Sequence, residues 1–261
     1  MRGSKKVVFH VKHRTVRNTL VIELGKLHRV LSSAPRGGGL IRARSILNHQ
    51  VSPNPALLPS NGSVRVRRTM RCSDPARYLA KVALVAKAAF PVVGLMTAVP
   101  MKRLVKGREE SQGIWIECFC TVGVTNAVRA GDPAIHRGET RRCSHIGTIN
   151  IILVTNATLA TPAMVGAVQV ATESKTATLI EMNVRNASGR RHATGTGTDA
   201  VVVAASIAGK YRVQYSGTHT NVGSMVGRLV ARCIREGLNR SPRSLSVIPQ
   251  SLAAGSHGPL H

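Results

Sequence analysis

Two short apolar segments and the long periodic segment between them constrain the fold of this chain most. Residues 149–155 (INIILVT) and 199–205 (DAVVVAA) are rich in β-branched residues and have the length of buried strands. Between them, Thr161-Pro162 is predicted to cap a long helix in which Met164, Ala167, Val168, Ala171 and Lys175 recur with a helical period. A strand, a long helix and a second strand predict a layered domain in which helices pack on a sheet.

The remaining pattern predicts more strands than helices. Strands are predicted over residues 18–24, 29–33, 92–99, 103–108, 114–124 and 211–215. Helices are predicted over residues 40–50, over about a dozen residues from Asp74-Pro75, and over 221–238. Several strands are joined by short turns, which favours an α+β fold, a layered mixed or antiparallel β-sheet with packed helices, rather than strict β-α-β alternation. We expect one domain over residues 18–239, a basic flexible N-terminus over 1–17 and a disordered tail over 240–261.

The charge of the chain is extreme but unevenly placed. There are 37 Lys and Arg against 11 Asp and Glu, a formal net charge of +26, which is often a sign of nucleic-acid binding. Residues 1–110 hold 22 of these cations against 4 acids, and residues 111–261 hold 15 against 7. Aromatic residues make up only 3% of the chain, so side chains that stack on bases are scarce. A nucleic-acid partner is therefore the less favoured interpretation.

The cysteines and the apolar runs indicate a cellular setting. The five cysteines are odd in number and have no CxxC spacing, which favours free buried thiols in a reducing compartment (Cys72, Cys118, Cys120, Cys143 and Cys233). No apolar run has the length of a signal-peptide core or a membrane span, so we expect a cytoplasmic protein without membrane contact. No HExxH, GxSxG, P-loop or metal-spaced Cys/His cluster occurs, and we assign no metal ligand.

The segment over residues 190–204 (RRHATGTGTDAVVVA) is the strongest candidate for a site. It places small, flexible and polar residues, among them Thr196, Thr198 and Asp199, directly against a predicted buried strand. Asp199 gains weight because acidic residues are scarce. Glu173, within the long predicted helix, is a second candidate carboxylate, with a solvated helix face as its alternative.

Three other loops carry candidate binding groups. Gly37, Gly38 and Gly39 lie between a predicted strand and a predicted helix, where they form either an anion-binding nest or a flexible turn. Asn126, in residues 121–133, suits amide recognition, with an Asx turn as the alternative. His219, in the segment SGTHT, is a general base, a metal ligand or a hydrogen-bonding group at a helix start.

Seven segments, in order along the chain, resemble the adenosylcobinamide amidohydrolase family of corrinoid salvage. They are RVLSSAPRGGGL (29–40), VGLMTAVPMK (93–102), VTNAVRAGDP (124–133), GTINIILVTNATL (147–159), ATESKTATL (171–179), ATGTGTDAVVVA (193–204) and YSGTHTNVG (215–223). The resemblance extends over roughly residues 18–238. Residues 51–73 and 134–146 depart from it by being unusually basic.

This resemblance implies hydrolysis of the amide that joins the propionyl side chain of the corrin ring to aminopropanol. The products are adenosylcobyric acid and 1-amino-2-propanol, and the corrinoid is the substrate, with no cofactor. We expect Asp199 or His219 to activate water, with Glu173 as a further catalytic candidate and backbone amides of residues 194–198 as oxyanion donors. A covalent ester through Thr196, Thr198 or Thr148 is the alternative. The expected substrate-binding residues are Ser33, Gly37, Gly38, Gly39, Asn126, Asp132, Thr148, Asn150, Thr196, Thr198 and Thr218.

Two other classes of function remain open from the sequence. A corrinoid-binding module without catalysis would bind cobinamide and release no aminopropanol. A basic nucleic-acid-associated protein would bind DNA or RNA with a steep dependence on salt. The oligomeric state stays open as well.

Overall fold

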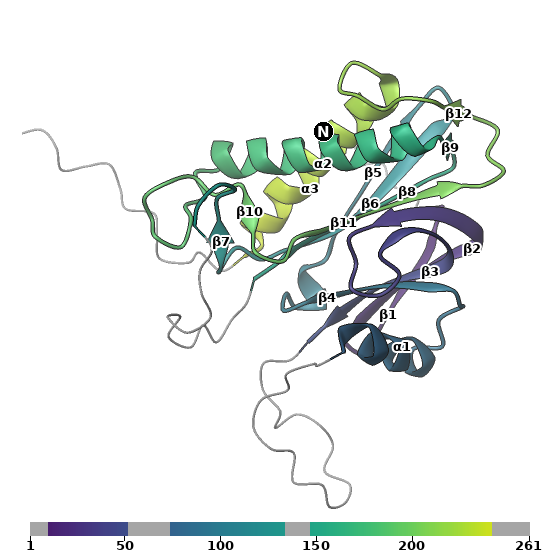
Figure 1. The fold of residues 1–261 in the computed structure, drawn as a ribbon, viewed down its shortest axis with the longest axis horizontal. Coiled ribbons are helices and arrows are strands. Elements are labelled where there is room, and N and C mark those ends of the chain that lie inside the picture. Colours follow the sequence, from purple (N-terminus) through teal and green to yellow (C-terminus); the bar gives the residue numbers. More distant parts are fainter. Residues whose placement is uncertain (1–9, 52–73, 134–146, 242–261) are drawn as a thin grey trace, which may run out of the picture.

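The computed structural model describes residues 10–51, 74–133 and 147–241, and it contains one large sheet with helices packed on it (Figure 1). The sheet has eight strands in the order β4-β3-β2-β11-β8-β6-β5, with β1 paired to β2. The β11–β8 and β3–β4 pairs are parallel and the other neighbouring pairs are antiparallel. The predicted mixed α+β fold is therefore confirmed.

The elements have the following bounds. The large sheet consists of β1 (Lys12–Val16), β2 (Thr19–Ser32), β3 (Gly39–Gln50), β4 (Val92–Thr97), β5 (Val105–Ser111), β6 (Ile114–Val122), β8 (Ile149–Thr155) and β11 (Ala200–Ser206). Two small pairs are β7 (Ala127–Val128) with β10 (Gly195–Thr196), and β9 (Thr158–Leu159) with β12 (Arg212–Val213). The helices are α1 (Pro75–Val85), α2 (Thr161–Glu181) and α3 (Asn221–Asn239), and Met101–Arg103 forms a 3₁₀ turn.

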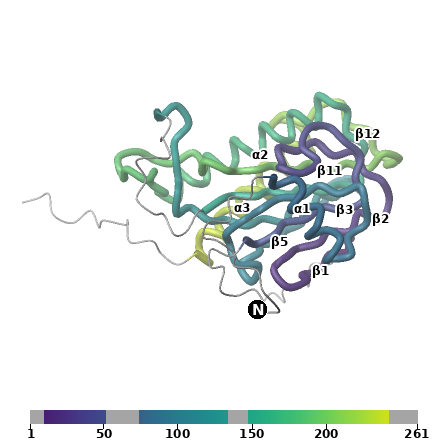
Figure 2. Tube along the Cα trace, turned by 60° about the horizontal axis from the view of Figure 1, so that its bottom comes forward, coloured from purple at the N-terminus to yellow at the C-terminus, as the bar shows by residue number. Residues whose placement is uncertain are grey.

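Buried apolar side chains form three clusters, which lie between the layers of the fold. The largest lies between the helices α2 and α3 and the strands β5, β6, β8 and β11. In the second, residues of β2, β3 and β4 pack against residues of β6, β8 and β11, because the sheet bends back on itself. The third packs α1 on β2, β3 and β4. Figure 1 shows α2 and α3 on one side of the sheet and α1 on the other, and Figure 2 shows β1 away from α2.

Local sequence signals set the ends of the helices. The Asp74 carboxylate accepts a hydrogen bond from the Arg77 N–H at 2.8 Å, with Pro75 in the first turn, as the sequence predicts. Thr220 caps α3 by accepting from the Gly223 N–H at 3.0 Å. The predicted cap at Thr161 is wrong: Thr161 is the first residue of α2, and the N-cap residue, Ala160, has no side chain that could make a cap bond. None of the described helices is both long and apolar enough to cross a membrane.

The prediction of a helix over residues 40–50 is wrong. The segment is strand β3, paired with β2 on one side and with β4 on the other. A short apolar run has no decisive period of its own, and ladder hydrogen bonds to two neighbours determine its conformation. The glycines before it therefore form a turn between two strands, with Gly37 at φ +68° and Gly39 at φ +83°, and no helix N-terminus follows them.

Two further expectations for the N-terminal part differ from the structure. The strands predicted over residues 18–24 and 29–33 are one strand, β2, whose pairing with β3 is irregular between Glu23 and His28. Residues 12–16, expected to be flexible, pair with β2 as β1. The remainder of the expected flexible ends, residues 1–9 and 242–261, lies outside the described residues.

Candidate active site

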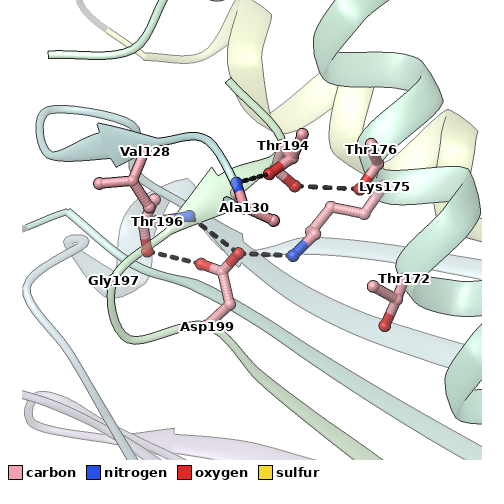
Figure 3. A pocket seen from close by; sticks show the side chains of 10 residues that line it. Val128, Ala130, Thr172, Lys175, Thr176, Thr194, Thr196, Gly197 and Asp199 are labelled. Atoms are coloured by element: carbon pink, nitrogen blue, oxygen red, sulfur yellow. Dashed lines mark hydrogen bonds and ion pairs between the residues drawn. The ribbon is translucent and has the colours of Figure 1, made fainter. Parts of the chain in front are cut away.

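A pocket of about 470 Å³ opens between the C-terminal half of α2, the β7–β10 pair and the start of β11 (Figure 3). Among the described residues that line it, most polar side chains are threonines, and one lysine and one aspartate are ionisable. The lining consists of Val128, Ala130, Thr172, Lys175, Thr176, Thr194, Gly195, Thr196, Gly197 and Asp199. The segment that the sequence marks as the strongest candidate thus forms one wall.

The Asp199 carboxylate accepts hydrogen bonds from four donors. Its Oδ1 accepts from the Thr196 hydroxyl at 2.6 Å and from the Ile149 N–H at 3.0 Å. Its Oδ2 accepts from Lys175 Nζ at 2.6 Å and from the Thr196 N–H at 3.0 Å. Two donors on each oxygen fill the acceptor capacity of a carboxylate. Asp199 is therefore held in one orientation, and its contact with the Thr196 hydroxyl faces the pocket.

Lys175 is the charged residue of the pocket that the sequence analysis did not predict. Its side chain is only 8% exposed and forms an ion pair with Asp199, whose side chain is 13% exposed. The signal was present in the sequence, because Lys175 follows the apolar stripe of α2 at a buried position. A lysine at such a position requires an anionic partner, and the acids available to it are few.

Gly195 is required by this ion pair. A Cβ at Gly195 would lie 2.4 Å from Asp199 Oδ2 and 2.8 Å from Lys175 Nζ. Any side chain at this position would therefore push the lysine and the aspartate apart. The glycine in the Thr-Gly-Thr sequence thus serves close packing of charged groups.

Threonines fix the strands and loops around the pocket. The Thr176 hydroxyl of α2 donates to the Thr194 carbonyl at 3.0 Å, and the Ala130 N–H donates to the Thr194 hydroxyl at 2.8 Å. Thr148 donates to the Thr198 carbonyl at 2.8 Å on the other side of Asp199. These bonds connect α2, the β7–β10 pair and β8 at one point, so the pocket wall is built before a ligand arrives.

Among the predicted catalytic residues, the structure brings only Asp199 to the pocket. Glu173 is exposed on α2 and does not line the pocket. His219 is exposed just before α3, near Ser216, whose hydroxyl donates to the Ala163 carbonyl in the first turn of α2 at 2.6 Å. Lys175 lies twelve residues further along that helix, a rise of about 18 Å. Thr218 is exposed in the same loop as His219.

The predicted binding residue Asn150 lies in the interior, away from this pocket. It is 1% exposed, and its Nδ2 donates to the Asn48 side-chain oxygen and to the Met96 carbonyl, both at 2.9 Å. Asn48 in turn donates to the Thr121 hydroxyl at 3.0 Å. These bonds hold together the two halves of the bent sheet.

Asn126 and Asp132 flank the β7 strand at the edge of the site. Neither lines the pocket. Asp132 accepts from Asn186 Nδ2 at 2.9 Å and pairs with Arg191 at 3.4 Å, which ties this loop to the one before β10. The Asn126 side-chain oxygen is buried without a hydrogen-bond partner among the described residues.

Ser33 lines a second, smaller cavity of about 230 Å³ between α2 and the strands β2 and β11. Its hydroxyl accepts from the Val201 N–H at 3.3 Å. Gly37, Gly38 and Gly39 follow in the same β2–β3 turn, and a Cβ at Gly38 would lie 2.6 Å from the Ala34 carbonyl oxygen. The close approach explains a glycine at position 38 without a ligand.

The described cysteines belong to the core. Cys118, Cys120 and Cys233 are free and buried. A hydrogen bond with Cys233, together with burial, raises the pKa of the Cys118 thiol well above its usual value, and burial does the same for the pKa of Cys120. Cys72 and Cys143 lie outside the described residues. Within the described residues, no group of three or more His, Cys, Asp or Glu side chains is placed to hold a metal ion.

Comparison with known proteins gives one family and two curated relatives. The model of the family described as adenosylcobinamide amidohydrolase matches residues 5–244. An uncharacterized protein of Methanocaldococcus jannaschii is 36% identical over 158 residues, 55% of this chain and 61% of that protein. A protein of Methanosarcina mazei named adenosylcobinamide amidohydrolase is 29% identical over 238 residues, 88% of this chain and 96% of that protein.

A solved structure also aligns with this chain. The PH0078 protein of Pyrococcus horikoshii is 10% identical, and the alignment covers 85% of this chain and 77% of that one with a TM-score of 0.38. A score this low does not establish a common fold.

Proposed function

Because the chain belongs to the adenosylcobinamide amidohydrolase family, we propose that it hydrolyses the amide between the corrin propionyl side chain and aminopropanol. The products are adenosylcobyric acid and 1-amino-2-propanol, and the corrinoid is substrate rather than cofactor. The match over residues 5–244 and the relative of the same name in Methanosarcina mazei support this assignment. The finer assignment depends on the chemistry of the pocket.

One observation carries the chemistry: the Thr196 hydroxyl, the Asp199 carboxylate and the Lys175 ammonium form a hydrogen-bonded chain in the pocket wall. Each of the two links measures 2.6 Å. A hydroxyl bonded to a carboxylate that a third group orients is the arrangement of an activated nucleophile. In the proposed reaction, the amide carbon lies against Thr196 Oγ1.

The geometry favours the threonine ester over direct activation of water by Asp199. All acceptor positions of Asp199 are occupied, so a water molecule would have to displace one of its donors. The Thr196 proton, in contrast, passes to Asp199 Oδ1 along an existing bond. Thr196 Oγ1 then bonds to the amide carbon, and the C–N bond breaks as the amine takes up the proton. Water hydrolyses the ester and restores the Thr196 hydroxyl.

Two groups are available to stabilise the oxyanion of the intermediate. An ammonium has three N–H donors, and Lys175 Nζ, which uses one on Asp199, lines the pocket. The Gly197 backbone belongs to the same wall and supplies an N–H. One such donor contributes about 10²–10³-fold in turnover. His219 has no part in this scheme, because its loop lies at the other end of α2.

The direct test is incubation of the purified full chain with adenosylcobinamide, with products separated by chromatography and identified by mass spectrometry. We expect equimolar release of adenosylcobyric acid and 1-amino-2-propanol without added nucleotide. Binding of the corrinoid with no product would favour the binding module without catalysis. A requirement for ATP would exclude simple hydrolysis.

The ester route has its own test. Rapid acid quenching during turnover, followed by intact-mass measurement, should show a corrinoid adduct on the chain, and peptide mapping should place it on Thr196. An adduct on Thr148 or Thr198 would identify that residue, instead of Thr196, as the nucleophile. Because water supplies an oxygen of the acid product on both routes, only the adduct separates them, and full turnover with no adduct at any quenching time would favour direct attack by water.

A further inference from the structure

An apolar surface continues from the pocket along α2. Its centre is the second cavity, of about 230 Å³, which is lined by Leu31, Ser32, Ser33, Val165, Val168 and Val201. Four of these side chains are apolar, and they lie on β2, α2 and β11; Leu40 of β3 extends the apolar surface beyond the cavity. We call this surface the α2 shelf and define it by Leu31, Leu40, Val165, Val168 and Val201.

The α2 shelf and the pocket share two elements. On α2, Val165 and Val168 of the shelf lie on the same face as Thr172 and Thr176 of the pocket, at spacings of three, four and four residues. From Val165 to Thr176 the helix rises about 16 Å. On the sheet side, Val201 is two residues from Asp199 along the chain, so shelf and pocket adjoin on this side as well.

The outer part of the α2 shelf is open to solvent, whereas Val201 at its base is buried. Val165 is 46% exposed and Leu40 is 43% exposed. Leu40 lies opposite Leu31 in the β2–β3 register, so the two side chains share a face of the sheet. In the described part of the chain, the apolar cluster under α2 and α3 is built on β5, β6, β8 and β11, and it includes Leu31 of β2 at its edge but no residue of β3. At the end of the α2 shelf away from the pocket, Arg29 of β2 donates a hydrogen bond to the Thr161 hydroxyl of α2 at 2.7 Å. This bond forms the boundary of the shelf.

We propose that the α2 shelf binds the corrin macrocycle while its amide arm enters the pocket. This inference rests on the proposed function. A pocket of about 470 Å³ is of the size that holds one small ligand, whereas the macrocycle with its side chains is far larger and must lie outside it. The propionyl amide side chain is short and is attached to the edge of the ring. When it lies in the pocket, the ring must contact a surface next to the pocket. The methyl-bearing faces of a corrin match a shelf of Val and Leu side chains, because burying them removes apolar area from water.

The test is a lysine placed on the shelf and a matched lysine placed elsewhere. Val165→Lys introduces a cation at an exposed helix position of the shelf, and Leu84→Lys does the same on α1, where Leu84 is 66% exposed. Equilibrium dialysis, with the visible absorption of the corrin as readout, measures the Kd of cobinamide and of cobyric acid. Thermal midpoints establish that both variants are folded.

Val165→Lys should raise the Kd of both corrinoids by the same factor, at least about tenfold, whereas Leu84→Lys should leave both unchanged. In turnover, the loss should fall mainly on KM rather than kcat. Val165→Leu, which keeps the surface apolar, should retain binding. An unchanged Kd for folded Val165→Lys would overturn the proposal, and so would a loss confined to cobinamide, since cobyric acid has the ring without the aminopropanol. Failure of the proposed function looks different: the wild-type chain would then release no aminopropanol, whatever its affinity.

Discussion

Two clusters of buried polar side chains are bonded to adjacent residues of β8, Ile149 and Asn150. They differ in charge, and only one of them lines the pocket. Ile149 donates its backbone N–H to Asp199, in the cluster that also contains Lys175 and lines the pocket. The side chain of the next residue, Asn150, joins Asn48 and Thr121 between the halves of the sheet, in a neutral cluster. Neutral amides and hydroxyls that satisfy one another are a means of joining strands.

Joining elements through a buried ion pair costs more free energy than joining them through neutral groups, because both ions must leave water. Its presence beside a pocket, in a chain with 11 acidic residues, is better explained by reactivity than by stability. The comparison teaches that burial alone does not separate structural from functional polar groups. Charge together with an opening to a cavity distinguishes the cluster that we propose to be catalytic.

The largest expected effect comes from Asp199→Asn. Turnover per folded molecule should fall at least about 10²-fold, because the Thr196 proton loses its acceptor. The variant should also lose about 3–5 kcal/mol of stability, since the nearly buried Lys175 is left without a counter-charge. Denaturant unfolding and turnover, measured on the same preparation, check both effects.

The double variant Lys175→Met, Asp199→Asn separates these two effects. It removes both charges, so most of the stability should return while turnover stays low. Recovery of turnover along with stability would mean that the pair is structural only, like the neutral cluster.

Replacement of Thr196 should sharpen the distinction within the charged cluster. Thr196→Val removes the hydroxyl at similar volume and should lower turnover about 10²-fold or more, since both the proposed nucleophile and one donor to Asp199 are lost. Thr196→Ser keeps a hydroxyl and should stay within about tenfold of the wild-type chain. If valine and serine lowered turnover equally, the hydroxyl would have no chemical part.

Asn150→Ala probes the neutral cluster. The Asn48 side-chain oxygen and the Met96 carbonyl would each lose a donor, and unfolding free energy should fall by about 1–3 kcal/mol. Turnover per folded molecule and the KM should be unchanged. A rise in KM with no loss of stability would instead indicate that Asn150 binds substrate.

The smallest expected effect is a dependence of stability on pH through His49. This ring bonds the Thr19 hydroxyl at 2.8 Å and the Tyr78 hydroxyl at 2.9 Å, and burial lowers the pKa of His49 below its ordinary value of 6.5. Between the lowered pKa and 6.5, the unfolded chain binds a proton that the folded chain does not, so stability should fall as the pH drops through this window. Denaturant midpoints of the wild-type chain and His49→Gln at several pH values test this, and the variant should show the weaker dependence.

The sequence predicted some residues of the candidate site but not their partners. Thr196 and Asp199 could be found because glycines, threonines and a scarce carboxylate stand together before an apolar strand. Lys175 and Asp199 are 24 residues apart, and no local pattern pairs them. Glu173 is a carboxylate on the correct helix, but the helical turn directs it to solvent. His219 shares the polar loop character of the site and lies near the other end of α2.

The sequence by itself determined the elements whose period or caps are strong: β8, α2, α3 and the capped start of α1, together with the family. It did not determine the fate of residues 40–50, because a short apolar run fits either helix or strand until neighbouring strands supply or withhold hydrogen bonds. Only the tertiary structure decided that Asn150 is sealed in the interior while Asp199 opens to a pocket. The physical reason is that burial, ion pairing and saturation of hydrogen bonds arise between segments distant in sequence, whereas period and capping act within a few residues.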